Sequence, residues 1–378
     1  TRLTLPRLAA NSAIPPAIQG KDLVGIAQTG TGKTLAFGIP MIQRMANTKQ
    51  QGLVLLPTRE LALQADEMLG KIGRGLGLRA AVLIGGTALG PQAQALARNP
   101  HIIIATPGRL IDHLYQKRLR LDAVGVVVLD EADRMLDMGF LPQIQKILAA
   151  LPKERQTMLF SATMPADIMK LATGHMKLPI RVEIAPSGTA PEGVVHELFI
   201  VPRERKIALL AALLEKYQGS TLVFARTKYG AKRITQRIRA MNIRAAELHS
   251  NRSLSQRREA LDGFKMGRYR VLVATDIASR GIDVIGIELV LNFDLPSSSD
   301  DYVHRIGRTA RAGAGGRAIT FAMPGEQREI RAIERLIRKP LPISELPELP
   351  PPAPPAFFPS APGRRPNDAR THHSRRSF

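Results

Sequence analysis

The sequence predicts an α/β protein with two tandem parallel-sheet domains and a disordered, Pro-rich, basic tail. Short apolar runs alternate with helical stretches over most of the chain, a pattern typical of parallel strands buried on both faces. The runs form two series, and Glu183–Gly193 between them is rich in Pro, Gly and Ser and lacks a hydrophobic period. The length of 378 residues fits two domains and a tail, at about 150 residues for each domain.

The two series of strands define the expected boundaries. The first domain takes residues 1–182, the linker 183–193 and the second domain 194–340. The strands expected in the first domain are Leu23–Ile26, Leu53–Pro57, His101–Thr106, Val126–Asp130 and Thr157–Ser161. Those expected in the second are Thr221–Ala225, Val271–Thr275 and Leu289–Phe293.

Residues 341–378 differ in composition from the domains before them. Ten of the 28 prolines lie between Pro342 and Pro366, and such a segment can build neither a helix nor a sheet ladder. We therefore expect an extended or disordered tail. Its arginines could touch nucleic acid, but five basic and three acidic residues make a solvated tail the simpler interpretation.

The net charge of +22, from 54 basic and 32 acidic residues, indicates a polyanionic partner, because clustered Lys and Arg gain from the release of phosphate counterions. Most of this charge lies in the two domains. The alternative is a basic proteome in which the charge only maintains solubility. Aromatic residues make up 4% and Trp is absent, which argues against a platform on which bases stack.

Cysteine is absent, which excludes disulfides, thiolate metal sites and cysteine nucleophiles and fits a cytoplasmic protein. No apolar run approaches the roughly 20 residues that cross a bilayer, and the chain does not open on an export signal. It begins at Thr1 and not at Met, so we expect residues before it.

A glycine-rich segment after the strand Leu23–Ile26 predicts a phosphate-binding loop. Its glycines let backbone N–H groups surround phosphates at a helix N-terminus. Lys33 can reach the β- and γ-phosphates, and the Thr34 hydroxyl can bind Mg²⁺. The general pattern has glycine where this chain has Ala27, and an ordinary strand-to-helix turn is the alternative. The expected nucleotide contacts are Ala27, Gln28, Thr29, Gly30, Thr31, Gly32, Lys33 and Thr34.

Three carboxylates follow the apolar strand Val126–Asp130. Buried acids at a strand end are costly unless a cation compensates them. Asp130 is placed to hold Mg²⁺ through water, and Glu131 to orient and deprotonate the attacking water. The alternative is an ordinary helix N-terminus with acids in its first turn.

The segment His304–Arg311 contains three arginines, which repel one another unless an anion lies among them. Arg308 and Arg311 fit the arginine-finger role, in which a guanidinium neutralises charge on the transferring γ-phosphoryl group. A solvated surface charge run is the alternative.

These motifs, in this order, resemble the DEAD-box family of superfamily 2 RNA helicases over residues 13–340, with details most like the bacterial RhlE-type subgroup. The resemblance implies two RecA-like domains. Further motifs that carry it are Pro57–Leu61, Gly85–Gly86, Thr106–Arg109, Ser161–Thr163, Leu222–Ala225 and Ala274–Asp283.

The resemblance also implies roles for individual residues. Ser161 and Thr163 would couple the nucleotide and RNA sites, Asp133 and His304 would join contacts that form when the domains close, and Asp283 would contact the ATP ribose. RNA phosphates and riboses would be contacted by Thr58, Arg59, Gly86, Thr106, Gly108, Arg109, Arg257 and Thr275. Contacts to the backbone imply RNA binding without sequence preference.

Two departures from the family pattern stand out. The adenine-recognition glutamine is replaced by Ala10 or Arg7, depending on the register, and its upstream aromatic residue is absent. The Gln-x-x-Arg element reads Leu254–Arg257, so that its arginine is present and its glutamine is not.

Together these features predict an ATP-dependent RNA helicase that uses ATP and Mg²⁺ and opens short RNA duplexes locally. An ATP-gated RNA clamp or ribonucleoprotein-remodelling scaffold is the alternative from another class. A DNA helicase or transport ATPase explains fewer of the motifs. We further expect a monomer in the cytoplasm, with ribonucleoprotein or RNA-degradation partners bound through the tail.

Overall fold

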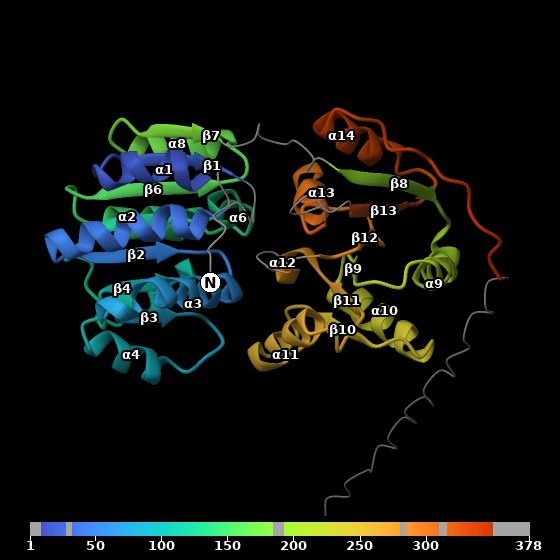
Figure 1. The fold of residues 1–378 in the computed structure, drawn as a ribbon, viewed down its shortest axis with the longest axis horizontal. Coiled ribbons are helices and arrows are strands. Elements are labelled where there is room, and N and C mark those ends of the chain that lie inside the picture. The colour runs from blue at the N-terminus through green and yellow to red at the C-terminus, as the bar shows by residue number, and fades with distance from the viewer. Residues whose placement is uncertain are drawn as a thin grey trace, which may run out of the picture.

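The computed structural model describes residues 9–27, 32–183, 193–279, 284, 286–309 and 316–350. It confirms two α/β domains, here called the first and second lobe, which lie next to each other in Figure 1. In the described part of the chain, the first lobe has a seven-stranded sheet and the second a six-stranded sheet. Every helix described is too short or too polar to span a bilayer.

The first sheet has the spatial order β3-β4-β2-β5-β6-β1-β7, with parallel neighbours throughout. Its strands are β1 (Leu23–Ile26), β2 (Gln51–Leu55), β3 (Ala80–Leu83), β4 (Ile102–Ala105), β5 (Val124–Leu129), β6 (Gln156–Ser161) and β7 (Ile180–Glu183). Its helices are α1 (Ala9–Ile18), α2 (Lys33–Thr48), α3 (Arg59–Gly73), η1 (Arg74–Leu76), α4 (Leu89–Ala97), α5 (Pro107–Tyr115), α6 (Ala132–Asp137), α7 (Leu141–Ala149) and α8 (Ala166–His175).

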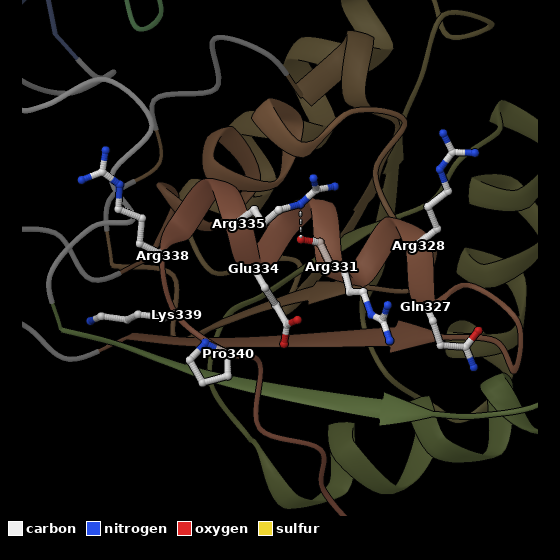
Figure 2. A pocket seen from close by; sticks show the side chains of 8 residues that line it. All are labelled: Gln327, Arg328, Arg331, Glu334, Arg335, Arg338, Lys339 and Pro340. Atoms are coloured by element: carbon white, nitrogen blue, oxygen red, sulfur yellow. Dashed lines mark hydrogen bonds between the residues drawn. The ribbon is translucent and has the colours of Figure 1, made fainter.

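The second sheet has the order β10-β11-β9-β12-β13-β8, again parallel throughout. Its strands are β8 (Val194–Ile200), β9 (Thr221–Phe224), β10 (Ala245–Leu248), β11 (Val271–Ala274), β12 (Leu289–Asn292) and β13 (Gly316–Ala322). Its helices are η2 (Arg203–Arg205), α9 (Lys206–Lys216), α10 (Lys228–Ala240), α11 (Leu254–Lys265), α12 (Asp276–Ser279), α13 (Ser299–Ile306) and α14 (Gln327–Ile337, Figure 2).

Strand β5 shows why the apolar runs form central strands. All six of its residues are buried. Val126 and Val128 pack into the core on one face of the sheet, whereas Val127 and Leu129 pack into the core on the other. Successive side chains of a strand point to opposite faces, so a strand covered by helices on both sides must be apolar at every position.

The strand order divides the carboxyl edge of the first sheet into two halves. The segments after β1, β5 and β6 are neighbours in one half, and those after β2, β3 and β4 are neighbours in the other. Ligands of open α/β sheets bind at the carboxyl ends of strands. This edge faces the second lobe (Figure 1), so two separate groups of loops point at the gap between the lobes.

Residues 341–350 of the expected tail are extended but ordered against the second lobe. Leu198 N donates to Pro342 O and Ser344 N donates to Leu198 O, both at 2.8 Å. Leu341 is buried, and leucines further along pack against the core under β9. Apolar side chains between the prolines therefore anchor this stretch. The rest of the tail, 351–378, and most of the expected linker lie outside the described residues.

Candidate nucleotide and RNA sites between the lobes

Lys33 begins α2 directly after Gly32, whose φ of 85° is in the left-handed region that glycine favours. Its Nζ lies 3.6 Å from Asp130 Oδ1 at the end of β5, and both side chains are buried. Burial raises the pKa of Asp130, and the neighbouring ammonium of Lys33 opposes that rise. The proposed phosphate lysine and metal carboxylate are therefore brought together. Gln28, Thr29, Gly30 and Thr31 lie outside the described residues.

The residues at this edge fit Mg²⁺. Thr34, in the first turn of α2, and Asp130 offer a hydroxyl and a carboxylate, the hard oxygen donors that Mg²⁺ prefers. In the described part of the chain there is no group of three or more His, Cys, Asp or Glu that could hold a metal. In the usual magnesium site of nucleotide enzymes, one or two side chains share the ion with phosphates and water.

Glu131 is the cap of α6 and has a left-handed backbone, with φ 54° and ψ 50°. A non-glycine residue in this region is strained, and such strain is concentrated at functional sites. Its buried carboxylate forms an ion pair with Arg134 one turn later. Burial raises the pKa of Glu131, but Arg134, Lys33 and Arg308 outweigh it and the pKa is lowered. The carboxylate is therefore ionised, as a proton acceptor must be.

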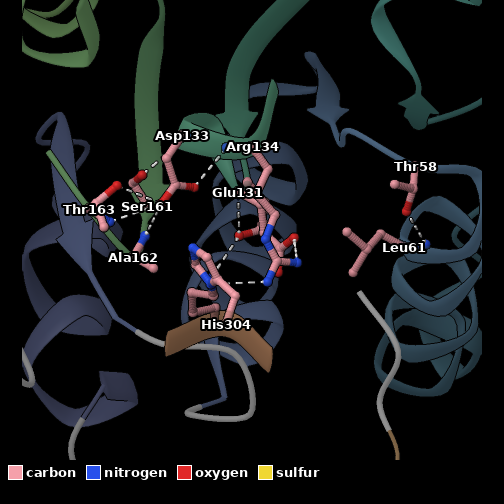
Figure 3. Close-up of polar contacts among 11 residues, drawn as sticks. Thr58, Leu61, Glu131, Asp133, Arg134, Ser161, Ala162, Thr163 and His304 are labelled. Atoms are coloured by element: carbon pink, nitrogen blue, oxygen red, sulfur yellow. Dashed lines mark hydrogen bonds and ion pairs between the residues drawn. The ribbon is translucent and has the colours of Figure 1, made fainter. Parts of the chain in front are cut away.

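Asp133 and the Ser161–Thr163 segment form one hydrogen-bonded unit inside the first lobe (Figure 3). Asp133 Oδ2 accepts from the backbone N–H groups of Ala162 at 3.0 Å and Thr163 at 2.9 Å, and from the Thr163 hydroxyl at 3.1 Å. Ser161 Oγ accepts from Asp133 N at 3.2 Å. A shift of the loop after β6 must therefore move the carboxylates after β5, which is a physical basis for the predicted coupling.

His304 reaches the first lobe from α13 and meets Arg134, not Asp133 (Figure 3). Arg134 Nη2 lies 3.2 Å from His304 Nδ1. Burial and the nearby Arg134 lower the pKa of His304 to about 3, so a neutral imidazole accepts this bond. Sequence reasoning assigned no role to Arg134, although it links Glu131 to the second lobe. The one feature of the sequence that pointed to Arg134 was its position directly after Asp133, the last of the three candidate carboxylates.

We expected the three arginines of this segment to repel one another unless an anion lies among them, and for Arg305 the structure shows a protein carboxylate in place of a bound anion. Its guanidinium is buried and paired with Asp276 of its own lobe at 2.6 and 2.8 Å. It also donates to Asn292 Oδ1 at 3.1 Å. Arg308 is buried too, and it helps to lower the pKa of Glu131 across the lobe boundary. Arg311 and Asp283 lie outside the described residues.

The predicted RNA contacts of the first lobe gather in the other half of the sheet edge. Thr58 follows β2 and caps α3, where its hydroxyl accepts from Leu61 N at 3.3 Å (Figure 3). The Arg59 side chain lies against Gly86, whose φ of 74° and lack of a Cβ allow this close approach.

The remaining first-lobe residues follow β4. Thr106 caps α5, and Gly108 and Arg109 lie in its first turn. Arg109 Nη1 donates to Thr87 O at 3.0 Å, and its Nε lies 3.3 Å from Asp112. The first turn of a helix presents unpaired backbone N–H groups, which suit a phosphate.

Arg257 extends this group across the lobe boundary. From the first turn of α11 it pairs with Glu60 of α3 at 2.9 Å, and both side chains are largely buried. Thr275, at the end of β11, donates its backbone N–H to Leu248 O at 3.2 Å. Among the described residues, the contacts that join the lobes include Arg134 with His304 near the carboxylates and Glu60 with Arg257 near the predicted RNA contacts.

Lobe closure should weaken as the pH falls below about 6.5, the ordinary His value. In the closed arrangement His304 is buried among Arg134 and Glu131 of the first lobe and Arg308 and Asp301 of its own, and burial and Arg134 lower its pKa to about 3. Below the ordinary pKa, His304 of the separated lobes binds a proton that the closed lobes exclude. The equilibrium constant for closure therefore falls by up to about tenfold for each pH unit. Energy transfer between dyes on the two lobes measures this, and a His304→Gln variant with the same pH response would contradict it.

Comparison with known proteins finds a matching family model for each lobe. Residues 8–171 match the model described as DEAD/DEAH box helicase, and residues 205–313 match the helicase conserved C-terminal domain. The DEAD-box ATP-dependent RNA helicase CshA of Bacillus licheniformis is 42% identical over 339 residues, which are 89% of this chain and 70% of that protein. The chain belongs to the DEAD-box family. It is an ATP-dependent RNA helicase with RNA-stimulated ATPase activity.

Solved DEAD-box structures add information on the lobe arrangement. Dbp5 of S. cerevisiae bound to RNA and ADP BeF3 is 28% identical and matches with a TM-score of 0.78, covering 87% of each chain. A DEAD-box protein of Methanococcus jannaschii is more identical, at 36%, yet has a TM-score of 0.53 with 88% of this chain and 91% of that chain covered. The two lobes taken together therefore match the RNA- and nucleotide-bound Dbp5 better than they match the M. jannaschii protein.

Proposed function

We propose that this DEAD-box chain hydrolyses ATP in the half of the cleft formed by the segments after β1, β5 and β6. Lys33 and the glycine-rich loop hold the phosphates, while Thr34 and Asp130 hold Mg²⁺. Mg²⁺ supplies positive charge to the phosphate oxygens. The observation that carries this proposal is the placement of Lys33 3.6 Å from Asp130 at the sheet edge, next to the buried ion pair of Glu131 with Arg134.

In this site Glu131 orients the attacking water and accepts its proton. Arg308, with Arg311 after it, neutralises the charge that develops on the γ-phosphoryl group as it transfers. The first lobe supplies the base and the second supplies the guanidiniums, so hydrolysis requires the lobes to be closed. Asp283 contacts the ribose in the same site.

RNA occupies the other half of the cleft and links binding to hydrolysis. The cations that we assign to it, Arg59, Arg109 and Arg257, are suited to phosphates, and binding to phosphates is independent of sequence. RNA that binds both lobes stabilises their closed arrangement, which assembles the hydrolytic site. Ser161 and Thr163 carry movement between the two halves through Asp133.

Closure bends one RNA strand and thereby opens short duplexes locally. A strand-separation assay with ATP and with a non-hydrolysable analogue tests this proposal. Separation with ATP is expected, with release of the single strand for further rounds. Stable RNA binding without strand separation would support the alternative, an ATP-gated clamp or ribonucleoprotein-remodelling scaffold.

Base discrimination should be weak in this chain. The chain does not have the glutamine with which the family pattern recognises adenine, and a site rejects an analogue strongly only when polar groups built to bind the base stay unpaired. We expect GTP hydrolysis within about tenfold of ATP hydrolysis, because the phosphate and Mg²⁺ contacts ignore the base. Steady-state rates with both nucleotides measure this, and a larger preference for ATP would show that another element reads adenine.

The remaining proposals concern the setting of the protein. We place it in the cytoplasm as a monomer, in keeping with the absence of cysteine. Its tail after the second lobe would bind ribonucleoprotein or RNA-degradation partners.

A further inference from the structure

Helix α14 carries a row of arginines that the proposed ATP and RNA sites do not use. Arg328, Arg331 and Arg335 follow one another at spacings of three and four residues, and Arg338 continues the row at the C-terminal cap. These spacings place all four on one side of a helix. The four are exposed, whereas the isoleucines of α14 are buried against β8 and β13.

The charge of this row is not neutralised by the described protein. Within the residues that the structure describes, none of the four guanidiniums takes part in a salt bridge, unlike many cations elsewhere on the surface. Glu334 is the carboxylate beside the row, and its Oε1 accepts from Leu341 N at 2.8 Å. Like charges at this spacing repel one another, so the row costs stability unless an anion binds.

A shallow groove of about 830 Å³ runs along these side chains and also takes in Lys339 (Figure 2). From Arg328 to Arg338 the row covers about 15 Å, at about 1.5 Å for each helical residue. A row of that length can contact successive phosphates of a nucleic-acid backbone. The row therefore suits a run of backbone phosphates in its charge.

The surface fits nucleic acid better than protein. None of the large exposed hydrophobic side chains in the described residues lies on α14, whereas the centre of a protein interface is apolar. Nucleic-acid interfaces are polar and strongly positive. Arginine also offers phosphates a planar, two-pronged donor.

Its position separates the row from the RNA half of the cleft. Arg257 lies on α11, which packs over β10 and β11 at one edge of the second sheet. Helix α14 packs over β13 and β8 at the other edge, and the two helices lie at opposite ends of the lobe in Figure 1. An RNA in the cleft reaches α14 only if it continues beyond the bound segment.

We propose that the arginine row of α14 is a second RNA-binding surface, which holds the backbone phosphates of RNA flanking the segment bound between the lobes. This inference rests on the proposed RNA site in the cleft. Binding of RNA to this row adds affinity and no sequence preference, because phosphates carry no sequence information. The protein would therefore favour long or structured RNAs over short strands.

The test replaces the four arginines together, as Arg328→Gln, Arg331→Gln, Arg335→Gln and Arg338→Gln. Fluorescence anisotropy measures binding of uridine strands of about 8 and about 40 nucleotides, lengths below and above the site size of a single binding groove. The variant should bind the short strand as wild type does, with unchanged ATPase stimulation and a melting temperature at least as high, because the repulsion within the row is removed. On the long strand, the fall in affinity between 50 and 200 mM salt should be about 50-fold smaller than for wild type.

A matched control removes four exposed lysines instead, Lys21, Lys49, Lys153 and Lys177, each changed to Gln. These precede β1, β2, β6 and β7 at the edge of the first sheet that faces away from the cleft. The control should keep the salt response of wild type on both strands.

Equal binding of the long strand by wild type and the α14 variant, with the same salt response, would overturn the inference. An acidic protein would then be the better partner for the row. An equal loss in the control would also overturn it, because only overall charge would then matter. Failure of wild type to bind even the short strand would instead contradict the proposed RNA site, and the inference would fall with it.

Discussion

Glu131→Gln should lower ATP turnover by at least about 10²-fold while leaving ATP and RNA binding largely intact, because the change removes a general base and keeps the size and polarity of the side chain. Glu131 is held ionised by Arg134, Lys33 and Arg308, so the native side chain is ready to accept a proton and the amide is not. Single-turnover hydrolysis with saturating RNA measures the chemical step.

Glu154→Gln is the matched control for this substitution. Glu154 is exposed and pairs only at the surface, with Lys177 at 2.7 Å, so its loss should leave turnover unchanged. A Glu131→Gln rate within threefold of wild type would reject the assignment of Glu131 as the general base. Loss of a general base lowers the rate by about 10²–10⁴-fold, which is far more than threefold.

Arg308→Ala should lower hydrolysis by about 10³-fold, the effect of an arginine that stabilises the transferring phosphoryl group. Nucleotide binding should change little, because Lys33 and the proposed magnesium ligands lie in the other lobe. Arg308 is buried and its positive charge acts on Glu131, which places it at the lobe boundary. Turnover with saturating RNA and the dissociation constant of a fluorescent ATP analogue separate the two effects.

Arg268→Ala serves as the control, since Arg268 is an exposed arginine of the same lobe, 3.8 Å from Glu259. It should hydrolyse ATP as wild type does. A loss of nucleotide binding in Arg308→Ala equal to its loss of turnover would mean that this arginine binds the ground state and does not act on the transferring group.

The fold could be predicted from the sequence wherever a strand is buried on both faces. The expected strand Val126–Asp130 agrees with β5 within two residues, and Leu23–Ile26 matches β1 at both ends. Two of the strands without a prediction, β8 and β10, have mixed composition. β10 reads Ala-Ala-Glu-Leu and β8 contains His196 and Glu197, so their strand conformation comes from pairing within the sheet and not from an apolar run.

The site was predictable where its chemistry follows local motifs. Lys33 and Asp130 are nearly 100 residues apart in the chain, yet their order after β1 and β5 puts both at one sheet edge. The contacts between the lobes were not predictable in this way. Glu60 with Arg257, and Arg134 with His304, depend on how two independently folded sheets meet, which no spacing within either lobe encodes.

The same limit applies to Arg305. In the sequence it is one of three clustered arginines, and only the fold reveals that Asp276, from another strand end, neutralises it. The first residues of the tail are a further example. Their prolines predict an extended chain. That the leucines between the prolines pack against the core beside β8 and β9 is visible only in the folded structure.

In the proposed mechanism, RNA assembles the hydrolytic site by closing the two lobes. The most direct test is steady-state ATP hydrolysis by the full chain without nucleic acid, with single-stranded RNA and with DNA of the same sequence. We expect RNA to raise turnover by at least about tenfold, because closure brings Arg308 to the nucleotide. DNA should have little effect, because it lacks the 2′-hydroxyl groups of the riboses expected among the contacts. Equal turnover with and without RNA would contradict the account.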